Sequence, residues 1–142
     1  MDNSADSREM LRRAALRVTR PRLAVLNAVR RTPHVDTEYV ITALRTSDPD
    51  VSRQSVYNSL RVLADAGLLR RFQPAGSVAR YEVWTGDNHH HVVCRSCGAV
   101  ADVDCAVGES LCLIASHDGG FSIDEAEVIY WGRCPGCSTR TT

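Results

Sequence analysis

Two cysteine pairs are the residues of this 142-residue chain whose types and spacing point most directly to chemistry. Cys94 and Cys97 are separated by two residues, as are Cys134 and Cys137, and a glycine lies in or just after each pair. Thiolates bind zinc in tetrahedral sites, so the two pairs predict one Cys₄ zinc site. Four protein ligands leave no open position, and we therefore expect a structural ion that joins distant parts of the chain. Two separate reduced dithiols, or a disulfide pair, remain the alternative.

A second candidate metal site begins with His89 and His91, which point to the same face if their segment forms a strand. Asp102 could add a carboxylate oxygen to this pair. Glu82 and His34 lie in the other half of the chain, and a metal ion that bound them as well would join the two halves. Imidazole and carboxylate ligands together suit Fe(II), Mn(II), Zn(II) or Co(II). An exposed polar strand end is the alternative interpretation of the histidines.

The chain divides into a basic part and an acidic part. Residues 1–86 carry 14 arginines and 9 acidic residues, a net charge of +5. Residues 87–142 carry 3 arginines and 8 acidic residues, a net charge of −5. The chain has no lysine, and guanidinium groups can bind phosphate or guanine through two parallel hydrogen bonds. We therefore expect a nucleic-acid module at 1–86 and a metal module at 87–142.

Neither a membrane span nor a signal peptide is expected. No apolar run is long enough to cross a bilayer, and the first nine residues are polar and acidic. These features predict a cytoplasmic protein with no membrane partner. In a reducing compartment, paired cysteines bind metal more often than they oxidise.

The first module has the element order of a winged helix-turn-helix. Residues 8–16 have helical character, and Thr19, Asp36 and Ser52 can each cap a further helix through a side-chain oxygen. Two alternating runs joined by a Pro- and Gly-containing turn predict a β-hairpin over residues 68–84.

The helix that follows Ser52 is the candidate recognition helix, predicted over residues 53–66. Val56, Leu60 and Leu63 form its inward stripe. The outer and flanking residues can donate hydrogen bonds to phosphates and base edges, and they are Arg53, Gln54, Tyr57, Asn58 and Arg61. An ordinary solvated amphipathic helix is the alternative, which the flanking helix and hairpin disfavour.

The sequence pattern of residues 87–142 predicts a small α/β domain. We expect strands at 89–93 and 99–104, a helix at 107–116, and one or two strands within 121–132. Zinc or dimerisation usually supplements the core of so small a domain. The fold class predicted for the whole chain is α+β.

Several motifs spread along the chain are shared with one known superfamily. They are RVTRPR at 17–22, VSRQSVY at 51–57, ADAGLL at 64–69, RYE at 80–82, HHH at 89–91 and both Cys-x-x-Cys pairs. On these motifs the chain resembles the ferric uptake regulator (Fur) superfamily of metal-responsive bacterial repressors. The resemblance implies an N-terminal winged-helix domain, a C-terminal α/β dimerisation domain, and a homodimer that binds inverted-repeat operators in double-stranded DNA when metallated.

The resemblance also implies roles for individual residues. One structural Zn²⁺ per subunit falls on Cys94, Cys97, Cys134 and Cys137. The regulatory ion, Fe²⁺ or Mn²⁺ with Zn²⁺ as a further possibility, falls on His34, Glu82, His89, His91 and Asp102. Taken with the outer face of the recognition helix, the expected DNA-contacting residues are Arg17, Arg20, Arg22, Ser52, Arg53, Gln54, Tyr57, Asn58 and Arg61.

Some positions depart from the superfamily pattern. Asn58 stands where an arginine is common. A further metal site in some members would use His90, Glu109 and a histidine in the strand before the second cysteine pair. That strand reads DEAE at 124–127 here, with no histidine, so the site is not predicted. Cys105 and Cys112 are additional cysteines, expected to be packing residues rather than redox groups.

The sequence favours a metal-dependent, peroxide-responsive repressor. Asp102 and the stretches Gly-Asp-Asn-His-His-His and Asp-Val-Asp-Cys are similar to actinobacterial peroxide-sensing, catalase-peroxidase regulators, whereas Glu82 stands where peroxide sensors usually have aspartate. A repressor that senses iron or zinc availability is the alternative within the superfamily. An enzyme is not expected, since the chain lacks the His-Glu-x-x-His helix that is typical of zinc hydrolases. A protein-interaction module stabilised by a structural zinc ion is the alternative from a different functional class.

Overall fold

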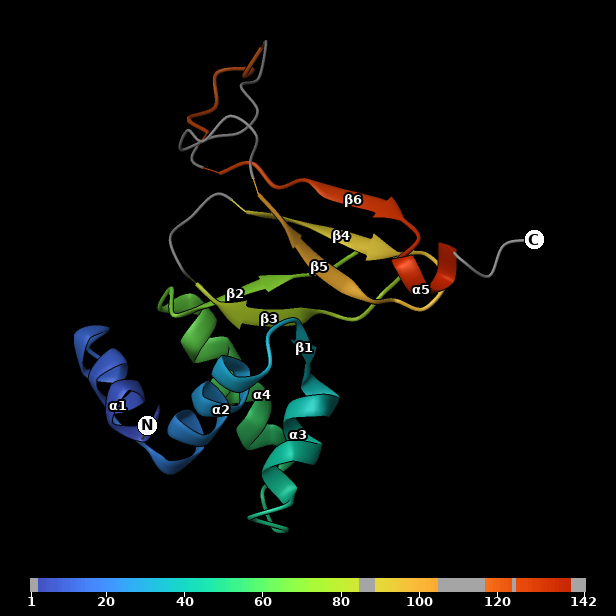
Figure 1. Ribbon diagram of the computed structural model, residues 1–142. Helices are drawn as coiled ribbons and strands as arrows, with labels where there is room; N and C mark the ends of the chain where they lie inside the picture. Colours follow the sequence, from blue (N-terminus) through green and yellow to red (C-terminus); the bar gives the residue numbers. More distant parts are fainter. Residues whose placement is uncertain (1–2, 85–88, 105–116, 124, 139–142) are drawn as a thin grey trace. The chain divides into compact units, whose positions relative to one another are not determined.

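The computed structural model describes residues 3–84, 89–104, 117–123 and 125–138 (Figure 1). The chain separates into two compact units, Met1–Thr85 and Gly86–Thr142. The division falls one residue before the boundary expected from the sequence. Within the described ranges, no helix is both long and apolar enough to cross a membrane.

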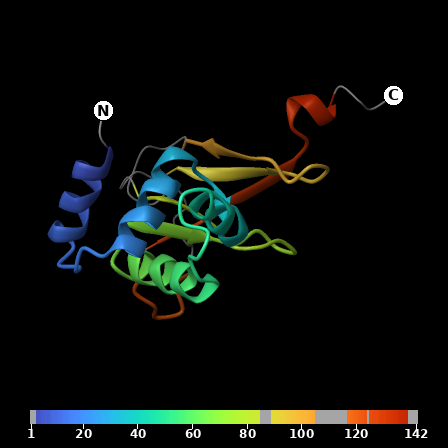
Figure 2. The same cartoon turned by 90° about the horizontal axis from the view of Figure 1, so that it is seen from below.

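Unit 1 consists of four helices and a small antiparallel sheet (Figure 1). Its elements in chain order are α1 (Asn3–Arg13), α2 (Arg20–Arg31), β1 (Val35–Asp36), α3 (Thr37–Arg45), α4 (Arg53–Asp65), β2 (Leu69–Phe72) and β3 (Arg80–Val83). The strand order is β1-β3-β2, so the hairpin of β2 and β3 gains a third, two-residue strand. Helix α1 lies against α2, and α2 in turn packs on α3 and α4 (Figure 2).

Each of the three predicted capping residues begins its helix. The side-chain oxygens of Thr19, Asp36 and Ser52 accept hydrogen bonds from the backbone N–H groups three residues later. These bonds satisfy donors that the first turn of a helix otherwise leaves without partners. Gly67 adopts φ +80 after α4, a left-handed conformation that glycine takes without steric cost.

The core of unit 1 contains the apolar stripes that the sequence indicated. Helix α4 buries Val56, Leu60 and Leu63 completely, while Tyr57 on its other face is 48% exposed. The matching buried residues of α2 and α3 are Val25, Leu26, Ala28, Val29, Val40, Ile41 and Leu44. Burying an aliphatic side chain of this size contributes about 1.5–3 kcal/mol, so this packing fixes which face of α4 meets solvent.

The structure also departs from the sequence-based expectations in unit 1. Helix α1 begins five residues earlier than the predicted segment at 8–16. Strand β1 was not predicted, because two residues form a strand only through pairing with β3, where Val35 faces Tyr81. His34, just before β1, has φ +63, which is uncommon for a residue with a side chain.

Unit 2 contains a three-stranded sheet with the order β5-β4-β6 (Figure 1). Its described elements are β4 (His90–Cys94), β5 (Val100–Val103), β6 (Ile129–Gly132) and the short helix α5 (Pro135–Ser138). Strand β4 pairs antiparallel with β5 and parallel with β6. The helix predicted at 107–116 lies outside the described residues. Strand β4 begins at His90, one residue later than predicted.

Candidate metal centres and nucleic-acid interface

The parallel pairing of β4 with β6 brings the two cysteine pairs to one end of the sheet. Cys94 ends β4 and lies in register with Gly132, the last residue of β6. Cys97 follows in the turn after β4, and the second pair follows β6 by two residues. The Sγ atoms of Cys94, Cys97, Cys134 and Cys137 all lie within 4.8 Å of one another.

The four thiols have the spacing of a tetrahedral zinc cage. Cys97 Sγ and Cys134 Sγ are 3.7 Å apart, and zinc–sulfur bonds of about 2.3 Å place the corners of a tetrahedron roughly 3.8 Å apart. All four are free cysteines, so the structure gives no support to the disulfide alternative. The four thiols therefore fit a Zn²⁺ ion bound entirely by protein.

Backbone hydrogen bonds favour a negative charge at this cluster. Bonds from the backbone of Cys134, Cys97 and Ser96 lower the pKa of Cys94 to about 6. Side-chain hydrogen bonds with Cys134, Cys94 and Cys97 raise the pKa of Cys137 to about 12. The first proton is thus lost readily and a later one is held, as expected when several thiols share a small volume. A divalent cation stabilises all the thiolates at once.

Unit 2 also presents a cluster of imidazoles around one carboxylate. His91 lies opposite Asp102 in the β4–β5 ladder. The Nε2 atoms of His91 and His89 are 3.6 Å and 3.7 Å from the same oxygen, Asp102 Oδ1. The two rings are edge to face with centroids 5.1 Å apart. His91 is fully buried and His89 nearly so, whereas the Asp102 side chain is half exposed. We call His89, His91 and Asp102 the histidine half-site.

Unit 1 contains a second cluster, formed by His34 and Glu82. His34 Nε2 is 3.2 Å from Glu82 Oε2, and both side chains are largely buried. The loop that carries His34 is held by Arg80, whose Nη1 donates a 3.0 Å hydrogen bond to the His34 carbonyl. On the other side of the carboxylate, Arg70 Nη1 lies 3.9 Å from Glu82 Oε1. We call His34 and Glu82 the glutamate half-site.

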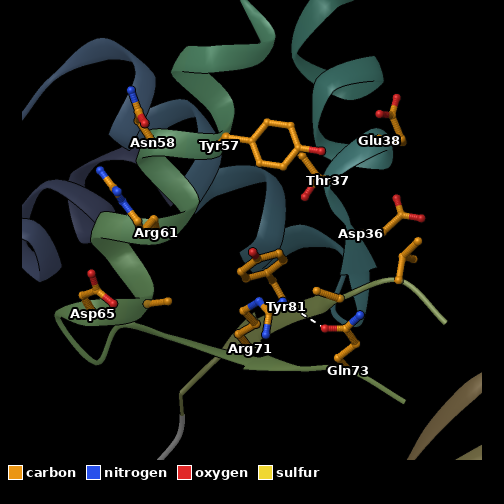
Figure 3. A pocket seen from close by; sticks show the side chains of 13 residues that line it. Asp36, Thr37, Glu38, Tyr57, Asn58, Arg61, Asp65, Arg71, Gln73 and Tyr81 are labelled. Atoms are coloured by element: carbon orange, nitrogen blue, oxygen red, sulfur yellow. Dashed lines mark hydrogen bonds between the residues drawn. The ribbon is translucent and has the colours of Figure 1, made fainter. Parts of the chain in front are cut away.

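The outer face of α4 borders a groove of about 660 Å³ within unit 1 (Figure 3). Tyr57, Asn58 and Arg61 of α4 line one wall, and residues of α3 and the hairpin line the rest. Three acidic residues, Asp36, Glu38 and Asp65, add negative charge to a surface that also offers hydrogen-bond donors and two tyrosine rings. The groove is open, with polar and charged groups among its lining, which suits a surface for a large ligand better than a pocket for a small one.

Several of the predicted DNA-contacting residues already have partners inside unit 1. The Arg53 guanidinium forms an ion pair with Glu38 of α3, which lowers the pKa of the Glu38 carboxyl and raises that of Arg53. Ser52 caps α4 and accepts a hydrogen bond from Ser55, so its hydroxyl has a structural role. The side-chain amide of Gln54 donates to Asn58 Oδ1 at 3.3 Å.

The arginines just before α2 and in its first turn, Arg17, Arg20 and Arg22, are arranged differently. Arg22 donates a 3.0 Å hydrogen bond to the carbonyl of Arg17, which ties the start of α2 to the preceding loop. Arg17 and Arg20 are exposed, as a role in phosphate contact requires.

Sequence reasoning missed Glu38 and Arg70 as parts of these surfaces. The signal for Glu38 was weak, since an acidic residue in the first turn of a helix is ordinary. The pairing of Arg70 with Glu82 follows from the register of β2 and β3. That register depends on the turn, and a slip of one residue would have placed the two side chains on opposite faces.

Comparison with known proteins gives consistent matches over the whole chain. The family model described as "Ferric uptake regulator family" matches residues 13–130. The chain is 63% identical over 142 residues to the transcriptional regulator FurA of Mycobacterium tuberculosis, covering 100% of this chain and 97% of that protein. It is 29% identical over 133 residues to the peroxide operon regulator of Bacillus subtilis, covering 93% and 91% of the two chains.

Among solved structures, the ferric uptake regulator from Pseudomonas aeruginosa with manganese matches with a TM-score of 0.66 at 26% identity, covering 91% of this chain and 98% of that chain. The predicted α+β fold class, with a cysteine cluster near the C-terminus, is confirmed.

Replacement of one cage thiol tests the zinc centre. We expect Cys94→Ser to lose zinc and to unfold unit 2, since structural zinc contributes on the order of 10 kcal/mol of folding free energy in small domains. Ser96→Ala, in the same turn, keeps all four thiols and should retain one zinc ion per chain. Metal analysis and circular dichroism are the measurements. A folded, metal-free Cys94→Ser protein would rule out a structural zinc here.

Replacement of Tyr57 tests the DNA-binding surface. We expect Tyr57→Ala to weaken binding to the DNA upstream of the chain's own gene by about 1–3 kcal/mol, because the exposed Tyr57 ring is expected to contact a base. Arg17→Ala should reduce the slope of log affinity against log salt by about one. Tyr39→Ala removes a comparably exposed ring from α3 and is the matched control. Equal binding by Tyr57→Ala and wild type in fluorescence anisotropy would show that the recognition face is misplaced.

Proposed function

This chain belongs to the ferric uptake regulator family, and we propose that it is a DNA-binding repressor switched by a regulatory metal ion. Its family makes it a metal-responsive transcriptional regulator and not an enzyme. Members of the family bind DNA as dimers. The finer points, namely the ligands, the metal, the operator and the signal, are the substance of the proposal.

One observation supports the switch most directly, which is that each unit carries an incomplete ligand set. The glutamate half-site offers an imidazole and a carboxylate, and the histidine half-site offers two imidazoles and a carboxylate. Neither set alone fills the octahedral shell that Mn²⁺ favours, and the histidine half-site alone would leave open positions on Fe²⁺. We propose that one ion takes ligands from both half-sites and thereby selects one arrangement of the two units.

The energetic logic of this switch is selective binding. A ligand shifts a conformational equilibrium only by its difference in affinity for the two states. An ion that completes its shell only when both half-sites converge favours that arrangement over all others. If that arrangement in a homodimer presents two α4 helices to successive major grooves, metal binding becomes DNA binding at an inverted repeat.

The proposed metals follow from the chemistry of the ligands. Imidazole with carboxylate suits Fe²⁺ or Mn²⁺ at the regulatory site, with Zn²⁺ as a competitor. The four thiols suit one structural Zn²⁺ per subunit. The solved relative from Pseudomonas aeruginosa is described with manganese, which supports a transition-metal site without fixing its identity in this chain.

The proposed signal is peroxide. A more distant relative is named a peroxide operon regulator, and the FurA relatives carry no such word in their names. Hydrogen peroxide would oxidise a ligand imidazole by two electrons, with one peroxide oxygen added to the ring and the other leaving as water, and an Fe²⁺ ion held by the half-sites would supply the chemistry that breaks the O–O bond. The resulting oxidised histidine is a poor ligand, so the site loses its metal and the dimer releases DNA. An iron- or zinc-availability sensor without this oxidation is the second candidate.

Loss of a single regulatory ligand tests the switch. We expect His91→Ala or Asp102→Ala to abolish metal-dependent DNA binding while keeping the Cys₄ zinc, because the two sites use different residues. Asp104→Ala removes an exposed carboxylate nearby and should bind DNA as wild type does. Zinc analysis beside a metal titration of DNA binding separates the two sites. Metal-dependent binding that survived in both ligand variants would refute the proposed switch.

Mass spectrometry tests the peroxide response. After exposure of the Fe²⁺ form to peroxide, a peptide carrying His34 or His91 should gain the mass of one oxygen atom, whereas the Mn²⁺ form should resist. Release of DNA through a disulfide between Cys105 and Cys112, with both histidines unmodified, would replace iron chemistry by thiol chemistry. Those two cysteines lie outside the described residues.

A further inference from the structure

A buried arginine lies against the carboxylate of the glutamate half-site. Arg70 and Glu82 are direct cross-strand partners in the β2–β3 ladder. The Arg70 side chain is 8% exposed and the Glu82 side chain 5% exposed. The two oxygens of Glu82 face different groups, since Oε1 is 3.9 Å from Arg70 Nη1 and Oε2 is 3.2 Å from His34 Nε2.

The surroundings of Arg70 hold its charge in place. Its guanidinium carbon lies 5.5 Å from the centroid of the Trp84 ring, a cation–π distance. An arginine does not lose its proton in a protein, so this charge is permanent. A buried charge of this kind is costly unless an opposite charge accompanies it. Glu82 therefore stabilises Arg70 whether or not a metal ion is bound.

We propose that Arg70 acts as a built-in counter-cation that competes with the regulatory metal ion for Glu82 and so sets the metal affinity of the site. The inference rests on the proposed function, because it assumes that Glu82 is a metal ligand. Arg70 does not contact the ion in this proposal, and its charge acts through the carboxylate that it faces.

The competition follows from the charges alone. Without metal, Arg70 lies against Glu82 as its counter-charge, and Glu82 is the buried carboxylate among the described residues of unit 1. A divalent cation held by Glu82 would share the carboxylate with Arg70, and the repulsion between the two positive groups would weaken the binding of the ion. The site would therefore bind metal less tightly than its ligands alone allow. Weakened affinity lets a regulatory site release its ion when the free concentration falls.

A purely structural role for Arg70 predicts the opposite result. If Arg70 served only to orient Glu82, its removal would disorder the ligand and weaken metal binding. If Arg70 competes with the metal, removal of its charge tightens binding. The sign of the change in affinity distinguishes the two roles.

The test measures Mn²⁺ binding to the full-length, zinc-loaded protein, using the electron paramagnetic resonance signal of free aqueous Mn²⁺. We expect Arg70→Gln to bind Mn²⁺ roughly tenfold more tightly than wild type, because a buried positive charge near the ion is removed. Arg70→Lys keeps a cation at this position and should bind Mn²⁺ about as weakly as wild type. An unchanged or weaker affinity in Arg70→Gln would overturn the inference.

Arg71→Gln is the matched control. It makes the same charge change one residue along β2, where the side chain is exposed and donates a 3.0 Å hydrogen bond to Gln73. We expect it to leave Mn²⁺ affinity unchanged, and equal tightening in both variants would show that only net charge matters. If Arg70→Gln does not fold, Arg70→Met is the second neutral variant, with an apolar stem to pack against Trp84 and the same expected tightening.

Glu82→Gln separates this inference from the proposed function. If Glu82→Gln binds Mn²⁺ as tightly as the wild-type protein does, Glu82 is not a ligand and the regulatory site itself is wrongly placed. If Glu82→Gln weakens Mn²⁺ binding while Arg70→Gln fails to tighten it, the site stands and only the role of Arg70 is wrong.

Discussion

The parallel pairing of β4 with β6 is the contact on which the chemistry of unit 2 depends. Strand β4 contains His91 and ends at Cys94. Its pairing with β5 places His91 opposite Asp102 in the histidine half-site, and its pairing with β6 brings the two cysteine pairs together. Strands of four or five residues supply little burial, and among the described residues of this unit only Val93 and Cys94 are buried hydrophobics. A parallel pair also closes a long loop, which costs conformational entropy. An ion bound by residues on both sides of that loop would offset this cost.

Local rules accounted for much of unit 1 from the sequence. Thr19, Asp36 and Ser52 were identifiable as caps because their side-chain oxygens accept hydrogen bonds from donors only three residues away. The buried stripe of α4 followed from helical periodicity for the same reason. The ligand types and the cysteine spacing were likewise visible in the printed sequence, and they sufficed to indicate two kinds of metal chemistry.

Non-local pairing explains what the sequence did not reveal. Strand β1 exists because β3 lies beside it, and its two residues have no periodicity to detect. Glu82 faces Arg70 because the hairpin has a particular register. Arg53 is engaged by Glu38 across two helices, so a residue that looked available for phosphate has a competing partner. In each case the deciding group lies far away along the chain, where patterns of neighbouring residues carry no information.

The backbone of His34 has a consequence for stability that is separate from its imidazole. Its φ of +63 lies in the left-handed region, where glycine has no steric penalty and where asparagine, aspartate and histidine are the side chains found most often. Under the proposed function, His34 contributes a ligand to the glutamate half-site. Replacing it by glycine would relax the backbone and remove that ligand in one step, so a more stable protein would have lost its response to metal.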